Sequence, residues 1–305
     1  MTRGALVIGE AVVDVVVAAD GSQARHPGGS PANVALGLGR LGRPVQLLTH
    51  LGHDDDGRLI TDHLHDSGAA LLPGSATAER TPVATAHLDA TGAATYEFDL
   101  AWKVSGDAEA PRELLVVHTG SIAVTLEPGA SATADIVRDL RDVATVTYDP
   151  NARPSLMGDP ADARVAVEQM VALADVVKVS DEDLEWFSRD GESIDDLAGS
   201  WLEAGPALVV ITRGGDGATV LTADHRFDVA APAVKVADTV GAGDSFMGGL
   251  IDGLWAAGLL GAERREGLRA ADPATLRRVV ERCIAIAAIT VSRSGANPPT
   301  LAELA

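Results

Sequence analysis

Residues 238–249 carry the clearest chemistry in the chain, and they read Asp-Thr-Val-Gly-Ala-Gly-Asp-Ser-Phe-Met-Gly-Gly. An apolar stretch over 233–237 predicts a short strand before them, and the apolar pattern over 245–257 predicts a helix after them. The first backbone N–H groups of a helix have no intrahelical partner, and the helix dipole adds positive charge at the same end. A strand–turn–helix unit of this kind therefore presents free backbone donors at its turn.

Three small residues, Gly241, Ala242 and Gly243, form this turn. Small side chains let backbone donors approach a ligand closely, so the turn is expected to bind a phosphate or another oxyanion. Asp244 follows, and its carboxylate would repel such a ligand unless it accepts a proton from a hydroxyl that then attacks the phosphate. The alternative is a Gly-rich turn in which Asp244 is an ordinary helix N-cap. These residues by themselves leave both interpretations open.

Charge and composition exclude several classes of partner. The chain has 305 residues with 44 acidic and 24 basic side chains, a formal net charge of −20. Nucleic acids and anionic membrane surfaces require basic patches, so neither is expected as a partner. The single cysteine, Cys283, excludes an intramolecular disulfide and a multi-cysteine metal site. With no signal-like N-terminal pattern and no apolar run of 18 residues, a cytoplasmic protein is expected.

Apolar runs of strand length alternate with helical patterns along most of the chain. The predicted strands cover residues 5–9, 45–51, 114–118, 145–148, 176–179 and 208–212. The predicted helices cover residues 31–41, 56–67, 131–143, 161–174, 181–188 and 194–203. Continuous apolar strands separated by helices predict a mostly parallel sheet that is covered on both faces. The expected fold is a three-layer α/β/α sandwich that forms a single domain over residues 1–305.

Two regions interrupt this alternation. Residues 12–20 and 81–103 carry strand-like residues without intervening helices, and 84–89 and 95–100 read as the two arms of a hairpin. Together they predict a small β-sheet that stands off the main domain, as a lid or as the interface of a homodimer. The alternative is that these strands extend one edge of the main sheet.

Polar clusters follow the ends of several predicted strands. Asp14 comes soon after the first strand, and Asn33 lies in the first turn of the next helix, behind Gly28 and Gly29. Further clusters occupy residues 149–153, 178–183 and 212–217. Because the carboxyl ends of parallel strands meet at one edge of a sheet, these clusters are expected to line one cleft.

Two other patterns do not indicate their usual function. Residues 37–42 match the Gly-x-Gly-x-x-Gly dinucleotide fingerprint, but they close a helix instead of opening one, which argues against nicotinamide binding. No lysine follows a glycine, so the chain has no Walker A loop. His50, His53, His63 and His65 fall close together, as the ligands of a metal site would. However, His63 and His65 lie two apart on a predicted surface helix and do not share a face, which argues against a metal site.

The order of the motifs resembles that of one family. Gly-Glu with Asp14, Pro-Gly-Gly-Ser-Pro-Ala-Asn-Val-Ala, Asp-Pro-Asn-Ala-Arg, Thr-Arg-Gly-Gly-Asp-Gly and Asp-Thr-Val-Gly-Ala-Gly-Asp follow one another along the chain. Over essentially its whole length the sequence resembles the ribokinase-like (PfkB) carbohydrate kinases, and its second motif is most similar to that of the bacterial fructokinases. The resemblance implies an enzyme that transfers a phosphoryl group from ATP to a primary hydroxyl of a sugar, with D-fructose as the expected acceptor.

The resemblance also implies a role for each motif. Asp244 would take the hydroxyl proton, while the turn of Gly241, Ala242 and Gly243 holds the charge of the transferring phosphate. The sugar would be bound by Asp14, Gly28, Gly29, Asn33 and Arg153, with Tyr96 and Phe98 of the small sheet closing over it. ATP would contact Lys178, Thr212, Gly214, Gly217 and, in a helix over 283–291 that walls the adenine, Ala287.

Metal ions enter through the same resemblance. The family commonly carries an Asn-x-x-Glu element that organises magnesium and phosphate, and the matching positions here are Ser180 and Asp183. Because the Asp183 carboxylate is one methylene shorter, Mg²⁺ is expected to bind it through water. Asp238 and the carbonyl group of Val240 fit a monovalent cation such as K⁺ beside the anion-binding turn.

Several alternative functions stay open at this point. A 2-keto-3-deoxygluconate kinase would use Arg153 for the substrate carboxylate. A ribokinase belongs to the same family, as does a nucleoside kinase, although four Trp, two Tyr and four Phe leave little material for an aromatic base pocket. The alternative from another class is a non-catalytic, sugar-binding regulatory protein on the same fold, against which Asp244 and its intact turn argue.

Overall fold

A computed structural model describes residues 3–18, 20–88, 94–104 and 110–304. Its centre is a nine-stranded sheet in the order β13-β12-β11-β10-β9-β8-β1-β4-β5, in which the β11–β12 and β12–β13 pairs are antiparallel and all other pairs parallel. The strands are β1 (Gly4–Ile8), β4 (Val45–Leu48), β5 (Ala69–Leu71), β8 (Leu114–Gly120), β9 (Thr145–Asp149), β10 (Val176–Ser180), β11 (Leu208–Thr212), β12 (Ala218–Leu221) and β13 (Arg226–Val229). Every main-sheet strand predicted from the six apolar runs is present.

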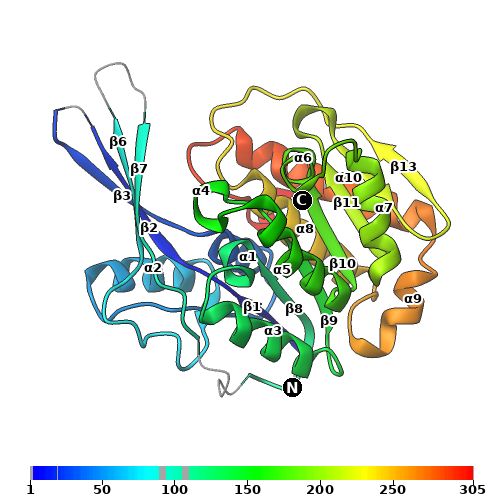
Figure 1. Cartoon of the computed structure of the whole chain (residues 1–305), viewed down its shortest axis with the longest axis horizontal. Coiled ribbons are helices and arrows are strands. Elements are labelled where there is room, and N and C mark those ends of the chain that lie inside the picture. The colour runs from blue at the N-terminus through cyan, green and yellow to red at the C-terminus, as the bar shows by residue number, and fades with distance from the viewer. Residues whose placement is uncertain (1–2, 19, 89–93, 105–109, 305) are drawn as a thin grey trace.

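Helices cover both faces of this sheet, which confirms the predicted α/β/α sandwich (Figure 1). One face packs against α1 (Ser30–Arg40), α2 (Asp55–Asp66), α8 (Ala242–Ala256), α9 (Arg265–Arg269) and α10 (Pro273–Val291). The other packs against α3 (Gly129–Leu140), α4 (Pro154–Met157), α5 (Pro160–Leu173), α6 (Asp181–Phe187) and α7 (Ile194–Ala204). Short 3₁₀ turns occur at Ser121–Val124, Gly214–Asp216, Ala262–Arg264 and Leu301–Leu304.

The core follows from the two-residue period of the strands. Along β1, Ala5 and Val7 belong to the hydrophobic cluster on one face, whereas Leu6 and Ile8 belong to the cluster on the other. All four side chains are buried, because a parallel strand in the middle of a doubly covered sheet has no solvent face. This continuous burial is why the strands appear in the sequence as unbroken apolar runs.

A second, four-stranded sheet stands away from the main body beside α2 (Figure 1). Its order is β3-β2-β6-β7, and only the β2–β6 pair is parallel. The strands are β2 (Val12–Val17), β3 (Gln23–Gly28), β6 (Val83–Leu88) and β7 (Ala94–Asp99). Since this sheet is separate and β12 and β13 form the antiparallel edge of the main sheet, the alternative in which residues 12–20 and 81–103 extend that sheet is wrong.

Strand β3 was not predicted, and its sequence explains why. Four of its six side chains are exposed, so Gln-Ala-Arg-His-Pro-Gly has no apolar alternation to mark it. Proline is tolerated on edge strands because it leaves only an outward-facing donor missing, and Pro27 lies on the edge strand of this sheet. Gly28 is the last residue of this strand.

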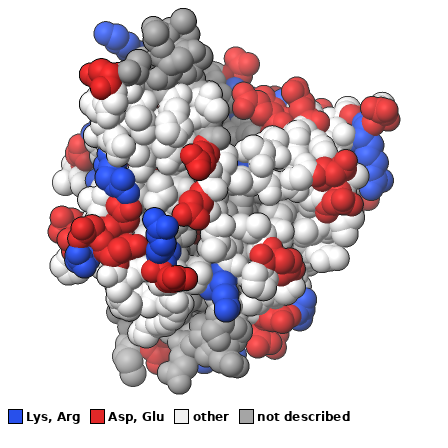
Figure 2. Space-filling model, turned by 60° about the vertical axis from the view of Figure 1, so that its left-hand side comes forward, with Lys and Arg blue, Asp and Glu red and all other residues white. Residues whose placement is uncertain are grey.

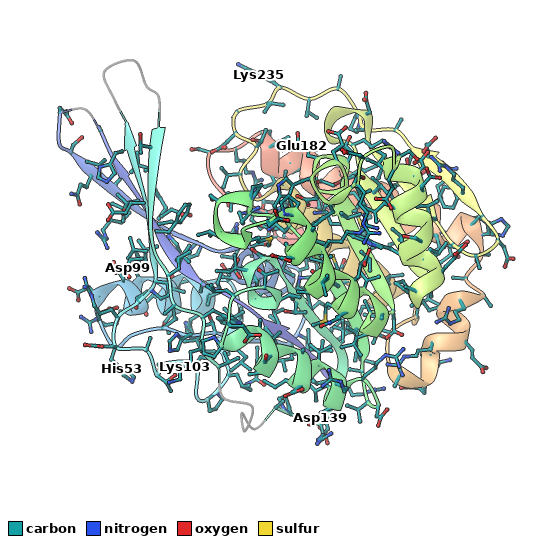
Figure 3. All side chains as sticks on the ribbon, in the orientation of Figure 1. His53, Asp99, Lys103, Asp139, Glu182 and Lys235 are labelled. Atoms are coloured by element: carbon teal, nitrogen blue, oxygen red, sulfur yellow. The ribbon has the colours of Figure 1, made fainter. Side chains whose placement is uncertain are left out.

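The strand predicted over residues 233–237 is wrong. The segment between β13 and α8 is irregular and largely exposed, and Figure 3 shows Lys235 pointing out from it into solvent. Val234 and Val236 are both exposed, and the segment pairs with no strand of the sheet within the described residues. The Ala237 N–H instead donates to the carbonyl of Val291, which ties the segment to the end of α10.

Two glycines allow helix α8 to pack closely against helix α10. A Cβ atom added at Gly249 would lie 3.3 Å from the Cα of Cys283, and one added at Gly253 would lie 2.8 Å from Cγ1 of Val279. Both contacts are with α10, so the two helices approach nearly backbone to backbone. The helix that begins at the Gly-rich turn is therefore fixed in the body of the protein.

The surface matches the net charge of the chain. Figure 2 shows the face on the side of the small sheet, where carboxylates are spread over the molecule and basic side chains stand singly or beside acidic ones. No helix within the described residues is long and apolar enough to cross a membrane.

Candidate functional site

A cavity of about 360 Å³ lies where the carboxyl edge of the main sheet meets the small sheet. It is bounded by the turn before α8, the start of α1, strands β2 and β7, and the ends of β1, β8 and β9. The cavity brings together ten of the predicted site residues, namely Asp14, Gly29, Asn33, Phe98, Arg153, Val240, Gly241, Ala242, Gly243 and Asp244. Residues far apart in the sequence thus line one cleft, whereas the predicted clusters at 178–183 and 212–217 do not line it.

The Asp244 carboxylate is held by two hydrogen bonds at the wall of the cavity. Ser30 Oγ donates to Oδ1 at 2.7 Å, and Asn33 Nδ2 donates to Oδ2 at 2.8 Å. The side chain is only 7% exposed. Gly241, not Asp244, is the N-cap of α8, so the interpretation of Asp244 as a simple capping residue is wrong. Both bonds favour the ionised carboxylate and orient it.

The turn before α8 offers free backbone donors, though not from all three of its small residues. Gly241 has φ 74°, a left-handed conformation that suits glycine. The N–H of Ala242 already donates to the carbonyl of Thr239 at 3.2 Å, whereas the N–H groups of Gly243 and Asp244 have no partner among the described residues. The expected contribution of Ala242 as a donor is therefore not met, and the N–H groups that are free within the described chain are those of Gly241, Gly243 and Asp244.

Asp14 enters the cavity from the small sheet. Burial raises the pKa of its carboxyl group, and the nearby His26 and Arg153 oppose that shift. Its Oδ2 atom would lie 2.1 Å from a Cβ atom added at Gly28, so Gly28 leaves the space that Asp14 occupies. Gly28 itself does not line the cavity, whereas the next residue, Gly29, does and is the N-cap of α1.

Arg153 lines the cavity but uses part of its guanidinium locally. Its Nη1 donates to Oδ1 of Asn151 at 2.8 Å and to the carbonyl of Ala152 at 2.9 Å. Phe98, on β7, is 36% exposed and contributes an apolar wall. Tyr96 belongs to the same strand, but its side chain lies outside the described residues.

Besides Thr239 of the turn motif, four polar residues that line the cavity were not among the predicted site residues. Ser30 stands inside the quoted Pro-Gly-Gly-Ser motif, and Glu10 inside the opening Gly-Glu, so both were visible without a role. Ser121 and Asn151 are the two non-glycine residues of the described chain with positive φ, at 54° and 39°. Asn151 stands inside the quoted Asp-Pro-Asn-Ala-Arg motif, and asparagine is enriched at such angles, whereas serine carries no signal for them.

Glu10 has the most perturbed environment of the four. Its side chain is 8% exposed, and burial raises the pKa of its carboxyl group to about 7. The nearby Ser121 hydroxyl opposes this shift most, Arg153 opposes it as well, and the Asp244 carboxylate reinforces it. The Oε2 atom is buried and has no hydrogen-bond partner within the described chain.

Lys178 does not line this cavity but lies buried behind the turn. Its Nζ atom donates to Oδ2 of Asp149 at 2.9 Å and would lie 2.9 Å from a Cβ atom added at Gly243. Burial alone would lower the pKa of Lys178, but the Asp149 carboxylate outweighs it and raises that pKa. An ammonium group is therefore held beneath the peptide that offers the free Gly243 donor.

The other predicted nucleotide contacts lie outside this cavity. Thr212 ends β11, and Gly214 and Gly217 follow it with φ values of 50° and 104°. They share the carboxyl edge of the sheet with the clusters at β9 and β10. Ala287 is a partly buried residue of α10 that packs against the core.

The predicted metal ligands are single carboxylates with structural partners. Oδ1 of Asp183 accepts from the N–H of Ala152 at 3.0 Å. The two oxygens of Asp238 accept from the N–H groups of Val240 and Gly295, at 3.0 and 2.8 Å. In the part of the chain that the structure describes, no three His, Cys, Asp or Glu side chains are grouped to hold a metal ion. One carboxylate fits an ion held mostly by water and phosphate oxygens, as Mg²⁺ usually is.

The fold and the cavity define a ribokinase-like kinase of small molecules, with a carboxylate and free backbone donors at a helix start. The sequence profile described as pfkB family carbohydrate kinase matches residues 3–303, and the chain belongs to that family. Its members are phosphotransferases that act on sugars, so this chain is an enzyme of that class.

Curated relatives of the chain are kinases of this class, and solved structures share its fold. The chain is 34% identical to a fructokinase of Rhizobium leguminosarum bv. trifolii, over 82% of this chain and 79% of that protein. It is 30% identical to a fructokinase of Escherichia coli, over 97% and 95%. The crystal structure of a fructokinase from Xylella fastidiosa with bound ATP superposes with a TM-score of 0.87 over 100% and 97% of the chains, and its 24% identity speaks to the fold alone.

Two more structures differ in the substrate that they contain. A fructokinase double mutant from Vibrio cholerae O395, in a fructose, ADP and potassium ion bound form, is 28% identical with a TM-score of 0.79 over 99% and 97% of the chains. An aminoimidazole riboside kinase from Salmonella enterica, complexed with aminoimidazole riboside and an ATP analog, is 27% identical with a TM-score of 0.80 over 99% and 98%.

Proposed function

We propose that the protein is a fructokinase, which transfers the γ-phosphoryl group of ATP to the primary 6-hydroxyl group of D-fructose and releases fructose 6-phosphate and ADP. Curated relatives at 34% and 30% identity that carry this name support the proposal. The observation that carries it is the Asp244 carboxylate, which is buried in the cavity wall, oriented by two hydrogen bonds and adjacent to free backbone donors.

In the proposed reaction, the 6-hydroxyl oxygen attacks the γ-phosphorus while its proton passes to Asp244. The bond between the γ-phosphorus and the bridging oxygen breaks, and ADP leaves with the electron pair. Ser30 and Asn33 hold the Asp244 carboxylate in position for the proton. The N–H groups of Gly243 and Asp244 stabilise the charge on the transferring group, which is the main need of a loose phosphoryl-transfer transition state.

The nucleotide and its ions are assigned to the same edge of the sheet. ATP is proposed to lie along Thr212, Gly214 and Gly217, with Ala287 beside the adenine, which puts its γ-phosphate at the turn before α8. Mg²⁺ would be held through water by Asp183, where it neutralises phosphate charge. A monovalent cation would lie at the carbonyl of Val240, beside Asp238.

The small sheet is proposed to cover the sugar. Asp14 and Phe98 reach the cavity from its strands, so a closed position would exclude water from the reacting hydroxyl. The same sheet could instead join two subunits, and light scattering of the purified protein separates a monomer from a homodimer.

Asp244→Asn tests the mechanism. The amide cannot accept the hydroxyl proton, so kcat is expected to fall about 10²–10⁴-fold while fructose still binds. Calorimetric titration with fructose checks binding, and a coupled ADP-release assay checks turnover. Asp139→Asn is the matched control, because Figure 3 shows this residue on the outside of the body at the end away from the small sheet. Near-normal turnover of Asp244→Asn would eliminate this residue as the base.

The acceptor is tested by comparing kcat/KM across fructose, ribose, tagatose, 2-keto-3-deoxygluconate and nucleosides. Fructose is expected to give the highest value. Arg153 in the cavity favours 2-keto-3-deoxygluconate as the second candidate, since a guanidinium group can bind a substrate carboxylate. If fructose is no better than the other compounds, the assignment as a fructokinase is wrong, although the sugar kinase assignment stands.

A further inference from the structure

Glu10 is a buried carboxyl group that faces the cavity and has no assigned role in the chemistry above. It follows β1 at the carboxyl edge of the main sheet, its side chain is 8% exposed, and it lines the cavity. Its Oε2 atom has no hydrogen-bond partner among the described residues. Buried polar atoms in proteins are nearly always paired, so an unpaired carboxylate oxygen at a cavity wall indicates a group that a ligand completes.

Two neighbouring loops present unpaired polar atoms to the same cavity. Ser121 Oγ, after β8, and Asn151 Nδ2, after β9, are both buried without a partner within the described chain. Both residues have positive φ, which costs energy for a side chain other than glycine. Three adjacent strands of the main sheet, in the order β9-β8-β1, therefore end in polar groups aimed at the cavity.

This polar wall differs from the part of the site that holds Asp244. The Asp244 oxygens are both satisfied by Ser30 and Asn33, as suits a base that must be oriented before the substrate arrives. Glu10 has no such support for its Oε2 atom. The reacting hydroxyl belongs at Asp244, so Glu10 is suited to a different hydroxyl group of the same sugar.

The surroundings of Glu10 hold the pKa of its carboxyl group close to physiological pH. Burial raises the pKa to about 7, and Asp244 on α8 adds to that effect, whereas Arg153 after β9 opposes it. Asp14 reaches the cavity from β2, with His26 beside it on β3. The nearby Ser121 hydroxyl, which is uncharged, lowers the pKa of Glu10 more than Arg153 does. The ionised form of Glu10 is therefore formed as the pH rises from 6 to 8.

We propose that Glu10 is a substrate-binding residue whose ionised carboxylate accepts a hydrogen bond from a sugar hydroxyl other than the one that is phosphorylated. This inference rests on the proposed sugar kinase function and names a specificity contact within it. An ionised acceptor binds a hydroxyl more strongly than a neutral one. The KM for the sugar is thus expected to fall as the pH rises through about 7, with little change in kcat from this group.

Paired changes in enzyme and sugar test the contact. The kcat/KM of wild type, Glu10→Gln and Glu10→Ala is measured with D-fructose and with its 1-deoxy, 3-deoxy and 4-deoxy analogues. For wild type, the analogue that lacks the partner hydroxyl is expected to lose about 10–100-fold, the size of a hydrogen bond to a charged group. That loss is expected to shrink in Glu10→Gln and to disappear in Glu10→Ala, while the losses for the other analogues stay as in wild type.

A pH series separates binding from a structural role. Wild type is expected to show a sugar KM that rises below pH 7, and Glu10→Gln a KM that is flat between pH 6 and 8, because glutamine does not ionise. Glu203→Gln, on the exposed surface of α7, is the matched control and is expected to behave as wild type in both experiments. Thermal melting of each variant reports any loss of folding, and Glu10→Gln alone decides the question if Glu10→Ala does not fold.

The inference is overturned if no analogue loses its discrimination in either Glu10 variant, or if Glu10→Gln keeps the pH dependence of wild type. Failure of the proposed function looks different, because wild type would then prefer another sugar to fructose. In that case the deoxy analogues of the preferred sugar replace those of fructose, and the same comparison tests Glu10.

Discussion

The main sheet and the small sheet both contribute to the cavity, but they are built in opposite ways. Strands β9 and β12 of the main sheet have every residue buried, and helices cover both faces. In the small sheet, β3 is mostly exposed and the described side chains of β7 are exposed as well. The base Asp244 belongs to the body with the main sheet, whereas Asp14 and Phe98 belong to the small sheet.

This difference in burial indicates which groups of the site are held rigidly and which can move. Extensive apolar burial fixes the groups that need an accurate geometry, which are Asp244 and the backbone donors beside it. In the small sheet, Val13 and Val15 of β2 belong to the core, but the low burial of β3 and β7 leaves those strands little to hold them in one position. These strands are suited to open and close over the sugar. Changes in the main body should therefore alter stability and turnover, and changes in the small sheet should alter sugar binding.

The largest effect is expected from breaking the buried pair of the main sheet. Lys178→Met leaves the Asp149 carboxylate buried without its partner, which should lower the free energy of unfolding by about 3–5 kcal/mol. The pKa of Asp149, raised by burial to about 6, allows this group to take up a proton, so the loss should be smaller at pH 5 than at pH 8. Urea denaturation at both pH values measures it.

A double variant separates charge from packing at this pair. Lys178→Met combined with Asp149→Leu leaves no buried charge and should recover most of the stability. Arg138→Met, which breaks an exposed pair with Asp135, should cost less than about 1 kcal/mol. Equal losses of stability for the buried and the exposed pair would contradict the prediction that burial makes the Lys178–Asp149 pair the more important one.

A smaller effect is expected at the root of the small sheet. Oδ1 of Asp54 accepts from the Gly57 N–H as the N-cap of α2, and Oδ2 accepts from the N–H of Thr81, just before β6. Asp54→Ala should therefore lower stability by about 1–2 kcal/mol and speed hydrogen exchange in β6. Exchange followed by mass spectrometry measures both the local and the global effect.

The same residue predicts a pH dependence. Burial alone would raise the pKa of Asp54, but the hydrogen bonds from Thr81 and Gly57 outweigh it and lower the pKa to about 2. The stabilisation is then complete above about pH 4, the pKa of an unfolded Asp, and is lost as the pH falls towards 2. Asp55→Ala, at an exposed neighbour, is the control and should change stability by no more than about 0.5 kcal/mol.

The smallest effect is expected for a wall residue of the small sheet. Phe98→Ala removes apolar surface over the sugar and should raise the KM for the sugar about 3–10-fold, with little change in kcat or melting temperature. Phe98→Leu keeps most of that surface and should stay close to wild type. A fall in kcat larger than the rise in KM would mean that the small sheet also takes part in catalysis.

The two sheets were also unequally visible in the sequence. Six of the nine main-sheet strands were predicted, because doubly covered parallel strands must be apolar throughout and such runs stand out between helices. The short strand β5 and the antiparallel strands β12 and β13 were not predicted. Strand β3 carries exposed residues that have no such constraint, and residues 233–237 imitate a strand although no neighbouring strand is available to pair with them. Burial alone did not decide which strands could be predicted, because the fully buried β12 was missed and the exposed β7 was predicted as one arm of the hairpin.

The site shows the same limit. Asp244 and Asn33 were found because they stand in motifs with a chemical reason, and the structure brings them into contact. The bond between Ala242 and Thr239, the backbone angle of Ser121 and the missing partner of Glu10 depend on how separate strands end in space. No spacing in a single chain encodes that arrangement, so these features appear only in three dimensions.

The close packing of α8 against α10 has a consequence for the evolution of such an enzyme. Because Gly249 and Gly253 bring the two backbones together, the helix that carries Asp244 has no room to shift when residues elsewhere are replaced. The surfaces that recognise the acceptor lie on other segments, in the small sheet and at the strand ends. Sequence drift there can alter the preferred acceptor while the apparatus for moving the phosphoryl group is inherited unchanged.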